Sequence, residues 1–395
     1  MNHQCQAYYG DFHIHIGSTS KGSPVKISAS RQLTFQAIAH EASARKGLDL
    51  IGIIDCHAPG VLKDIEYLLE QGEMTPLDGG GIRYGRTTII LGVELELREA
   101  NYGPAHVLCY MPTYEAMCHF SEWMSNHIRN MNLSTQRIYV SWQQLQEETA
   151  ARGGLFIPAH VFTPHKSVYG SCSDRLADVA DLSLVDAIEL GLSADTAMAS
   201  RMSELDQFPF LTNSDAHSLQ KIAREYNKLY LQEPTFQELA MALRGEGGRH
   251  IAANYGLNPL LGKYHKTTCP NGHLLNDLQS AACPICGSTR RIAGVADRID
   301  AIADRTEADA RSGVGCRPPY YEQIPLEHIP GIGPKVLDRL IMHFGSEMNV
   351  LHHASLEELA AVVPEGIAQR IVLGRAGQLQ VRSGGGGTYG KVISD

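Results

Sequence analysis

Histidines and carboxylates recur beside short apolar runs in the first 220 residues, and both residue types are ordinary ligands of catalytic divalent metals. The first pair is His13 and His15, in the segment Asp11-Phe12-His13-Ile14-His15. Residues two apart in an extended strand point to the same face, so both imidazoles can reach one ion. The pair alone is a weak signal, because the chain contains 18 histidines.

Seven further candidates lie where short apolar runs begin or end. They are Asp55 and His57 after Leu50–Ile54, Glu94 after Thr88–Val93, His106 before Val107, His160 after Leu155–Ala159, and Asp215 and His217 after Phe210–Ser214. A polar group at the edge of a buried strand is costly unless it is paired or ligated. This repeated placement favours a shared metal site over coincidence.

Mixed nitrogen and oxygen ligands suit zinc, manganese or iron better than magnesium alone. A bound cation lowers the pKa of its water ligand, and paired cations also clamp the attacking and leaving oxygens of a phosphoryl displacement. The sequence contains no G-x-S-x-G motif or comparable nucleophile. We therefore expect metal-assisted hydrolysis, with zinc in a structural site and in the catalytic site, and with Mg²⁺ or Mn²⁺ supporting activity.

The elements that must position these residues alternate between strand and helix over residues 1–255. Predicted strands are Ala7–His15, Leu50–Asp55, Thr88–Glu96, His106–Met111, Leu155–His160, Ala187–Glu189 and Phe210–Asn213, and predicted helices include Leu33–Lys46, Tyr114–Asn130, Trp142–Arg152 and Thr235–Arg244. This alternation favours parallel strands with crossover helices. We predict an α/β fold in which seven strands form a distorted barrel and the candidate ligands gather at its C-terminal mouth.

The whole residue set resembles the polymerase-and-histidinol-phosphatase (PHP) family of metal-dependent phosphoesterases. That resemblance implies a distorted (β/α)₇ barrel with up to three metals, and a catalytic role for His13, His15, Glu94 and Asp215. Carried over by position, those four residues hold one metal, and a second metal shares Glu94 with His106 and His160. A third metal would use His57 and His217, with Asp55 orienting or replacing a ligand.

A compact Cys/His cluster follows the predicted barrel. Cys269, His273, Cys283 and Cys286 form a C-x3-H…C-x2-C pattern. Four such ligands in two close pairs are typical of a closed, structural zinc site. Basic residues flank the cluster and are candidates for phosphate contacts; they are Lys263, Lys266, Arg290 and Arg291.

The segment Ile329–Lys335 reads Ile-Pro-Gly-Ile-Gly-Pro-Lys and precedes a clear helical pattern. Glycines let backbone N–H groups approach a phosphate, and a helix N-terminus adds favourable partial charge. The segment resembles a helix-hairpin-helix motif, which implies DNA-backbone contacts by Gly331, Gly333 and Lys335. We expect the domains to be the barrel at 1–255, the zinc module and linker at 256–322, the helix-hairpin-helix domain at 323–380 and a flexible tail at 381–395.

The order of barrel, zinc module and helix-hairpin-helix segment resembles the endonuclease Q family, as does Thr212–Ser218 with Arg224–Asn227. The resemblance implies cleavage of double-stranded DNA 5′ to a deaminated base (uracil, hypoxanthine or xanthine) or to an abasic site. Two alternatives stay open. One is a small-molecule phosphatase like histidinol phosphatase, and the other is a DNA-binding scaffold with a decayed site. A sliding clamp is a further partner to test, although no clamp-binding peptide stands out.

Bulk properties limit the protein class. The chain has 395 residues, 43% of them hydrophobic and 19% charged, which is a globular composition with room for two or three domains. We find neither a signal peptide nor an apolar run that could span a membrane, and isolated cysteines fit a reducing compartment, so we expect a cytoplasmic protein. The net charge of -9 counts against DNA binding, but an acidic metal site contributes to it.

Overall fold

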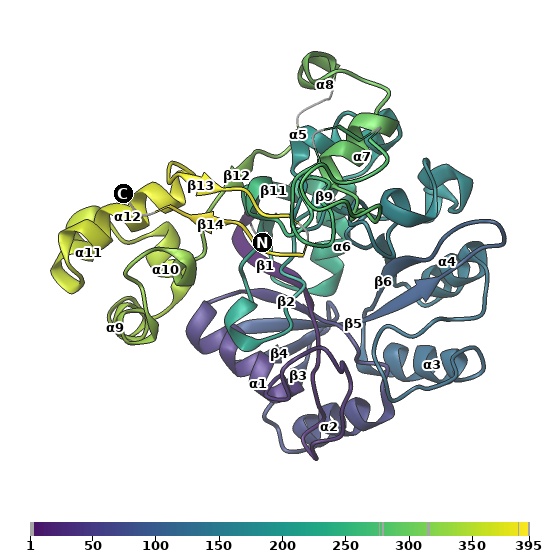
Figure 1. Ribbon diagram of the computed structural model, residues 1–395. Helices are drawn as coiled ribbons and strands as arrows, with labels where there is room; N and C mark the ends of the chain where they lie inside the picture. The colour runs from purple at the N-terminus through teal and green to yellow at the C-terminus, as the bar shows by residue number, and fades with distance from the viewer. Residues whose placement is uncertain (1–3, 276, 279, 314–316, 386, 394–395) are drawn as a thin grey trace.

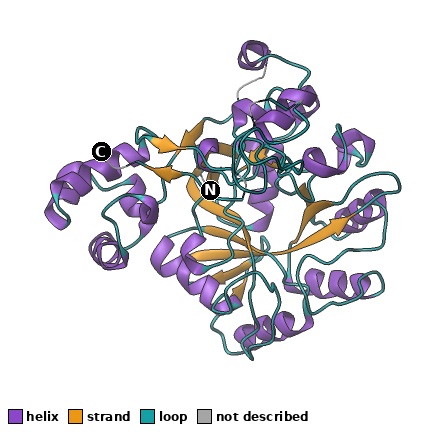
Figure 2. Cartoon of the chain, in the orientation of Figure 1, coloured by secondary structure: helices purple, strands orange, loops and turns teal. Residues whose placement is uncertain are grey.

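The computed structural model describes residues 4–275, 277–278, 280–313, 317–385 and 387–393. Strands gather at the centre of the molecule, helices surround them, and a lobe of short helices near the C-terminus lies to one side (Figures 1 and 2). The class is therefore mixed α/β, as predicted.

Among the described residues, the central sheet has ten strands, and Ile188–Glu189 pairs with Phe210–Leu211 in a separate two-stranded sheet. Together the two sheets include seven strands that cover the segments predicted from the sequence. These seven are β1 (Gln6–Ile14), β2 (Leu50–Ile53), β5 (Thr87–Leu97), β6 (Ala105–Met111), β7 (Leu155–Pro158), β8 (Ile188–Glu189) and β9 (Phe210–Leu211). Backbone hydrogen bonds continue the pairing from β7 to β8, through Val161 N–H to the Glu189 carbonyl at 2.9 Å, and from the end of β9 to β1, through Ala216 N–H to the His13 carbonyl at 3.0 Å. The seven strands thus follow one another around a ring.

The expectation that all strands run parallel is wrong in part. Strands β1, β2 and β5 are parallel neighbours, but β6 runs antiparallel to both β5 and β7. The connection from β5 to β6 is seven residues long, which is too short for a crossover helix. The sheet also continues beyond β1 through strands that the sequence analysis did not identify, namely β10 (Tyr226–Leu231), β11 (His250–Gly256) and β12 (Tyr320–Glu322), and beyond β5 through β4 (Ile82–Tyr84) and β3 (Thr75–Pro76).

Helices cover the outer face of these strands. They are α1 (Phe35–His40), α2 (Pro59–Glu70), α3 (Tyr114–Ser125), α4 (Trp142–Ala151), α5 (Thr196–Ala199) and α6 (Phe236–Arg244). The predicted helices at 33–46, 114–130, 142–152 and 235–244 correspond to α1, α3, α4 and α6, whereas α2 was not predicted. Ser and Thr side chains cap the N-termini of α1, α3, α4 and α6, which explains where these helices begin.

Apolar side chains fill both faces of the sheet. In β2, Leu50 contributes to one buried cluster, whereas Ile51 and Ile53 contribute to a second. All four residues of β2 are buried, so its continuous apolar run reflects burial on both faces. Polar groups at the strand ends therefore have little access to water and must satisfy one another or a ligand.

The C-terminal third contains α7 (Val295–Ile302), α8 (Glu307–Gly313) and the lobe formed by α9 (Pro334–Phe344), α10 (Glu347–His352), α11 (Leu356–Val362) and α12 (Glu365–Arg375). Residues 320–322, predicted to lie in a linker, instead form β12 at the sheet edge beside β11. A buried ion pair between Lys46 and Glu347, at 2.8 Å, fixes α10 to the barrel. None of the described helices is long and apolar enough to cross a membrane.

The segment 381–395 was predicted to be flexible, but its described residues form ordered backbone pairs. Within its described residues, β13 (Val381–Arg382) pairs with β14 (Lys391–Val392), and Gly384 N–H and Gly390 N–H donate to the carbonyls of Leu260 and Leu261 at 2.7 and 2.9 Å. A Cβ at Gly384 would lie 2.7 Å from the Gly262 carbonyl oxygen, so the glycines allow close packing. Residues 386, 394 and 395 lie outside the described residues.

Candidate metal centre

Two carboxylates orient the imidazoles of the H-x-H pair at the end of β1. Glu189, at the end of β8, lies 3.0 and 3.1 Å from Nδ1 of His13 through its two oxygens. Asp55, after β2, lies 2.9 Å from Nδ1 of His15. Both carboxylates and both rings are buried. When each Nδ1–H donates to its carboxylate, both Nε2 lone pairs are free to bind a cation.

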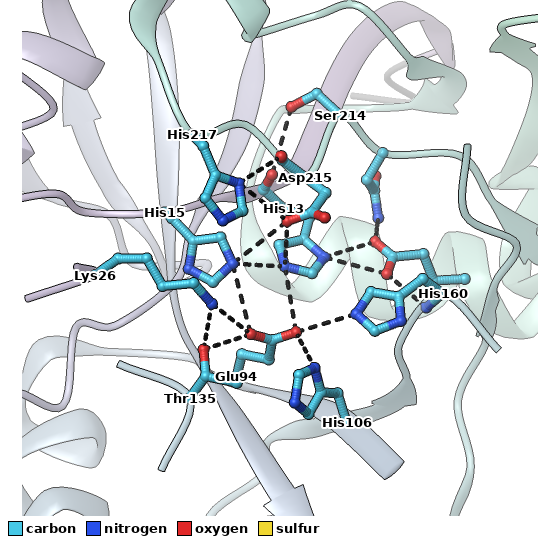
Figure 3. A network of polar contacts seen from close by, with 12 residues as sticks. His13, His15, Lys26, Glu94, His106, Thr135, His160, Ser214, Asp215 and His217 are labelled. Atoms are coloured by element: carbon cyan, nitrogen blue, oxygen red, sulfur yellow. Dashed lines mark hydrogen bonds and ion pairs between the residues drawn. The ribbon is translucent and has the colours of Figure 1, made fainter. Parts of the chain in front are cut away.

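These two lone pairs converge on one point. Nε2 of His13 and Nε2 of His15 are 3.2 Å apart, and Oδ1 of Asp215 is 3.6 and 3.4 Å from them (Figure 3). Glu94 approaches the same atoms at 3.8 and 3.5 Å. Facing acceptors at such distances repel one another unless a cation or proton lies between them. Burial alone would lower the pKa of His13, but Glu189, Asp215 and Glu94 raise it to about 10, so the site attracts positive charge.

Glu94 is shared with a second group of ligands on β6 and after β7. Its Oε1 lies 3.0 Å from Nδ1 of His106 and 3.2 Å from Nε2 of His160. The contact with His106 has no hydrogen-bond geometry, although it is short. Ligand atoms of Glu94, His106 and His160 all lie within 4.8 Å of one another, as do those of His13, His15 and Glu94. The residues therefore fit two adjacent cations that share one carboxylate.

The predicted pair for a third metal does not assemble. His217 joins His15 and Asp215 in a third group of ligand atoms, and Asp215 Oδ1 is 3.6 Å from its Nδ1. His57 belongs to none of the ligand groups among the described residues, although its ring is buried. Burial lowers the pKa of His57. Asp55 acts through His15, which is the orienting role that the sequence analysis left open.

Backbone strain is concentrated at this centre. Asp55, Thr135, His160 and Asp215 have positive φ angles of 76°, 53°, 29° and 45°, in the left-handed region that L-residues rarely occupy. Each precedes or carries a side chain that points toward the ligand cluster. Such conformations cost roughly 1–3 kcal/mol each, and they persist where surrounding structure fixes them, most often at functional sites.

A cavity of about 430 Å³ opens beside the cluster. Its lining includes residues of the cluster and its surroundings, namely His160, Glu189, Asp215 and His217, together with basic and aromatic residues, namely Lys221, Arg224, Lys263, Tyr264 and Tyr389. The volume lies within the roughly 300–1,000 Å³ of typical ligand pockets. The cavity therefore combines candidate metal ligands with basic and aromatic side chains in one lining.

Comparisons with known proteins decide the family. No family model matches the chain. The uncharacterized protein YqxK of Bacillus subtilis (strain 168) is 52% identical over 386 residues, which cover 97% of this chain and 98% of that protein. The crystal structure of the lesion-specific endonuclease PfuEndoQ from Pyrococcus furiosus has a TM-score of 0.84 and 32% identity, covering 98% of this chain and 95% of that one. An endonuclease Q complex with a 27-mer duplex substrate, with an abasic lesion at the active site, gives the same TM-score and identity over 99% and 97% of the two chains.

The chain belongs to the endonuclease Q family. Membership agrees with the resemblance noted in the sequence and confirms the predicted enzyme class, a metal-dependent nuclease. The agreement extends from the first strands to the C-terminal segment, because nearly the whole chain is covered.

This endonuclease Q family member also holds a Cys/His cluster whose ligand atoms lie close together. Cys269 Sγ is 3.4 Å from His273 Nδ1 and 3.7 Å from Cys286 Sγ, and Cys283 Sγ is 3.7 Å from the same His273 nitrogen. A tetrahedral zinc with sulfur ligands at about 2.3 Å has edges of about 3.8 Å. The four predicted residues therefore fit a closed metal site with no position left for water.

The residues predicted to bind DNA lie in three places. Gly331, Gly333 and Lys335 are exposed at the start of α9, where Gly331 has a φ of 93° and Gly333 is the N-cap. Lys263 lines the cavity beside the metal cluster. The remaining three basic residues flank the zinc cluster: Lys266 pairs with Asp297 at 3.0 Å, Arg291 donates to the carbonyls of Leu278 and Ser280, and Arg290 is exposed.

Sequence reasoning missed three residues of this endonuclease Q site. Glu189 ends a predicted strand, which was the available signal, but it was assigned no role. Arg224 donates to the carbonyls of Ser214 and Asp215 at 2.7 and 3.2 Å, and it also donates to the Tyr389 hydroxyl at 2.7 Å. Tyr389 lies in the segment predicted to be flexible. No local pattern signals that this tyrosine reaches a residue 165 positions earlier.

Proposed function

We propose that this endonuclease Q family member cuts one strand of duplex DNA on the 5′ side of a deaminated base or an abasic site. The single observation that carries the proposal is the position of the ligand cluster beside a cavity whose lining also includes Lys221, Arg224 and Lys263. The names of the two solved relatives, a lesion-specific endonuclease and a complex with an abasic lesion at the active site, support the substrate class.

The chain's own residues hold and orient the reacting groups. His13, His15, Glu94 and Asp215 form one cation site, and Glu94 with His106 and His160 forms the other. Divalent cations bound there supply hydroxide near neutral pH and offset the charge of the phosphodiester. Glu189 and Asp55 keep the two imidazoles of β1 in the tautomer that presents Nε2 to the centre.

The cavity provides space for an extruded nucleotide. An enzyme that acts at an altered base in a duplex must take that nucleotide out of the stack. Lys221, Arg224 and Lys263 supply positive charge for the flanking phosphates, and Tyr264 and Tyr389 supply ring faces on which a base can stack. An abasic nucleotide leaves part of this volume empty, and a deaminated base fills it.

The turn before α9 is a second DNA contact in this proposal. Gly333 caps this eleven-residue helix without a side-chain hydrogen bond. Pro334 has no N–H, and the N–H groups of Val336 and Leu337 donate to the Gly333 carbonyl, so the backbone N–H of Lys335 and its exposed ammonium are the groups that this proposal assigns to a phosphate. Such an N-terminus binds phosphate oxygens without reading sequence. Contacts of this kind add affinity that falls with salt, and they leave the choice of lesion to the cavity.

The test is strand cleavage of labelled duplexes that carry uracil, hypoxanthine, xanthine, an abasic site or no lesion, with Mg²⁺ or Mn²⁺ present. We expect cleavage only of lesion-containing duplexes, with product lengths that place the break 5′ to the lesion. His13→Ala and Asp215→Asn should abolish cleavage while duplex binding persists in gel-shift experiments.

Three results would count against the proposal. Equal cleavage of damaged and undamaged duplexes would remove the lesion requirement. Hydrolysis of small phosphomonoesters without any strand cleavage would instead favour the phosphatase alternative. Cleavage by both variants at the wild-type rate would show that the assigned ligands are not the reacting centre.

A further inference from the structure

A lysine lies among the metal-ligating residues and is not one of them. Lys26 belongs to the loop between β1 and α1, and its Nζ is 3.3 Å from Oε2 of Glu94 and 2.5 Å from Oγ1 of Thr135 (Figure 3). Thr135 in turn donates to the same Glu94 oxygen at 2.6 Å. Only 16% of the lysine side chain is exposed. An ammonium placed so deeply requires nearby negative charge to offset its lost hydration.

The backbone fixes this lysine in place. Lys26 N–H donates to the Ile16 carbonyl at 2.9 Å, and the neighbouring Val25 is buried and bonds to the Gly17 carbonyl at 3.0 Å. A Cβ at Gly17 would lie 1.9 Å from the Ser30 carbonyl oxygen, so the loop closes tightly on itself. The position of the ammonium is therefore set by the fold, and it does not depend on a flexible surface side chain.

The two oxygens of Glu94 have different partners. Oε1 faces His106 and His160, whereas Oε2 faces His15, Thr135 and Lys26. The acids around the cluster are Glu94, Asp215, Asp55 and Glu189, and all four are buried or partly buried. These four carboxylates and a phosphodiester carry five negative charges. Two divalent cations offset four of these charges, which leaves one for a cation that the chain itself provides.

We propose that Lys26 is a permanent cation of the catalytic centre, which acts through Glu94 to favour the negative charge that develops on the phosphate during cleavage. The inference rests on the proposed phosphodiester hydrolysis. Preorganised positive charge in a site with little water is worth far more than the same charge in solution. A second consequence follows from the same charge: Lys26 repels the divalent cations that bind beside it, so the chain holds them less tightly than the ligands alone would.

Removal of the charge should change turnover and metal affinity in opposite directions: turnover falls and Mn²⁺ binds more tightly. Lys26→Met takes away the ammonium, while Thr135 still holds Oε2 of Glu94. We expect turnover on an abasic duplex to fall at least about tenfold, because loss of a preorganised group that contacts the reacting atoms directly costs about 100- to 1,000-fold and Lys26 acts through Glu94. We expect Mn²⁺ binding to become at least about threefold tighter, the direction that Coulomb's law gives for removing a like charge. A lysine that only supported the fold would weaken both.

The experiment measures both quantities on the full chain carrying its structural zinc. Free Mn²⁺ is counted by electron paramagnetic resonance during titration, which needs no substrate, and single-turnover cleavage is measured at saturating Mn²⁺. Lys26→Arg keeps the charge, so its Mn²⁺ affinity should stay near wild type and its turnover should exceed that of Lys26→Met. Lys21→Met is the matched control, because Lys21 is an exposed lysine of the same loop. Thermal unfolding verifies that each variant folds.

Three outcomes would overturn the inference. They are unchanged turnover in Lys26→Met, Mn²⁺ affinity that stays the same or weakens in that variant, and Lys26→Arg behaving no better than Lys26→Met. If wild-type protein fails to cleave the duplex, the proposed function fails. The Mn²⁺ titration still shows whether Lys26 repels the bound cations.

Discussion

Glu189 lies 3.0 Å from Nδ1 of His13 and 2.8 Å from the backbone N–H of His160, so one buried carboxylate fixes a residue from each of the two cation sites. Asn213 donates to the same carboxylate at 2.8 Å. Glu189 belongs to none of the ligand groups among the described residues. It is a positioning residue, and it contacts His13 of one cation site and His160 of the other.

Glu189→Gln should therefore weaken metal binding and activity together, by about 10- to 100-fold, the usual cost of losing a partner behind a metal-ligating histidine. The amide keeps nearly the same shape but cannot hold His13 through two negatively charged oxygens. Metal content after gel filtration and cleavage of an abasic duplex give the two readouts. Glu233→Gln, at an exposed glutamate, is the control. Wild-type metal content in Glu189→Gln would show that the carboxylate does not support the site.

Tyr389 should contribute to substrate binding. Its ring lies 4.6 Å from Lys263 Nζ and its hydroxyl accepts from Arg224. Tyr389→Ala removes both contacts, so we expect the KM for duplex to rise about five- to tenfold, corresponding to roughly 1 kcal/mol for an interaction of this kind. Tyr389→Phe keeps the ring and should show a smaller rise. Tyr67→Ala, at an exposed tyrosine on α2, should leave KM unchanged. A KM for Tyr389→Ala equal to that of wild type would show that Tyr389 does not take part in binding the duplex.

Glu225 predicts a dependence of stability on pH. Burial raises the pKa of this carboxyl to about 8 from an ordinary 4.5, and its Oε2 has no hydrogen-bond partner in the part of the chain that the structure describes. The folded chain therefore keeps a proton that the unfolded chain releases. This difference makes its full contribution to the free energy of unfolding below pH 4.5, and the contribution is lost as the pH rises from 4.5 to 8. Glu225→Gln avoids this loss.

The difference in unfolding free energy between Glu225→Gln and wild type should thus grow from pH 5 to pH 9, by an amount on the order of 3 kcal/mol. Denaturant titrations at both pH values measure it. Glu70→Gln, at an exposed glutamate, should show no such trend. A constant difference for Glu225→Gln across this range would mean that the carboxyl ionises normally in the fold.

Loss of one thiol should open the Cys/His cluster. Cys283→Ser removes a ligand from a closed site, so we expect the chain to lose about one zinc and the surrounding segment to unfold locally. Trypsin cleavage after Arg290 and Arg291, followed by mass spectrometry, detects that unfolding. Cys118→Ser, at a cysteine outside the cluster, is the control. Retention of zinc by Cys283→Ser would contradict a site built from these four residues.

Much of the fold was predictable because the buried strands carry strong local patterns. All seven predicted strands overlap observed ones, since runs such as Leu50–Ile53 are apolar throughout. The direction of β6 was not predictable, because periodicity does not distinguish parallel from antiparallel strands. Strands β10 and β11 were missed because they contain polar residues such as Asn227 and Asn254, whose side-chain N–H groups donate to carbonyls in the buried interior.

The candidate site was predictable in its ligands but not in the residues that act on them. His13, Glu94 and Asp215 follow strand patterns and belong to types that bind metals. Lys26 and Tyr389 have no such signal, because a lysine in a loop or a tyrosine among glycines is usually exposed. The tail was misjudged for the same reason: glycines that indicate flexibility in a sequence here allow close packing against Leu260 and Leu261.

The most direct test of the central claim is an anomalous difference map from crystals of the chain soaked in Mn²⁺, recorded near the manganese edge. We predict one peak between Nε2 of His13 and Nε2 of His15, and a second peak between Glu94, His106 and His160. A map with manganese bound elsewhere and no peak at either position would contradict the account.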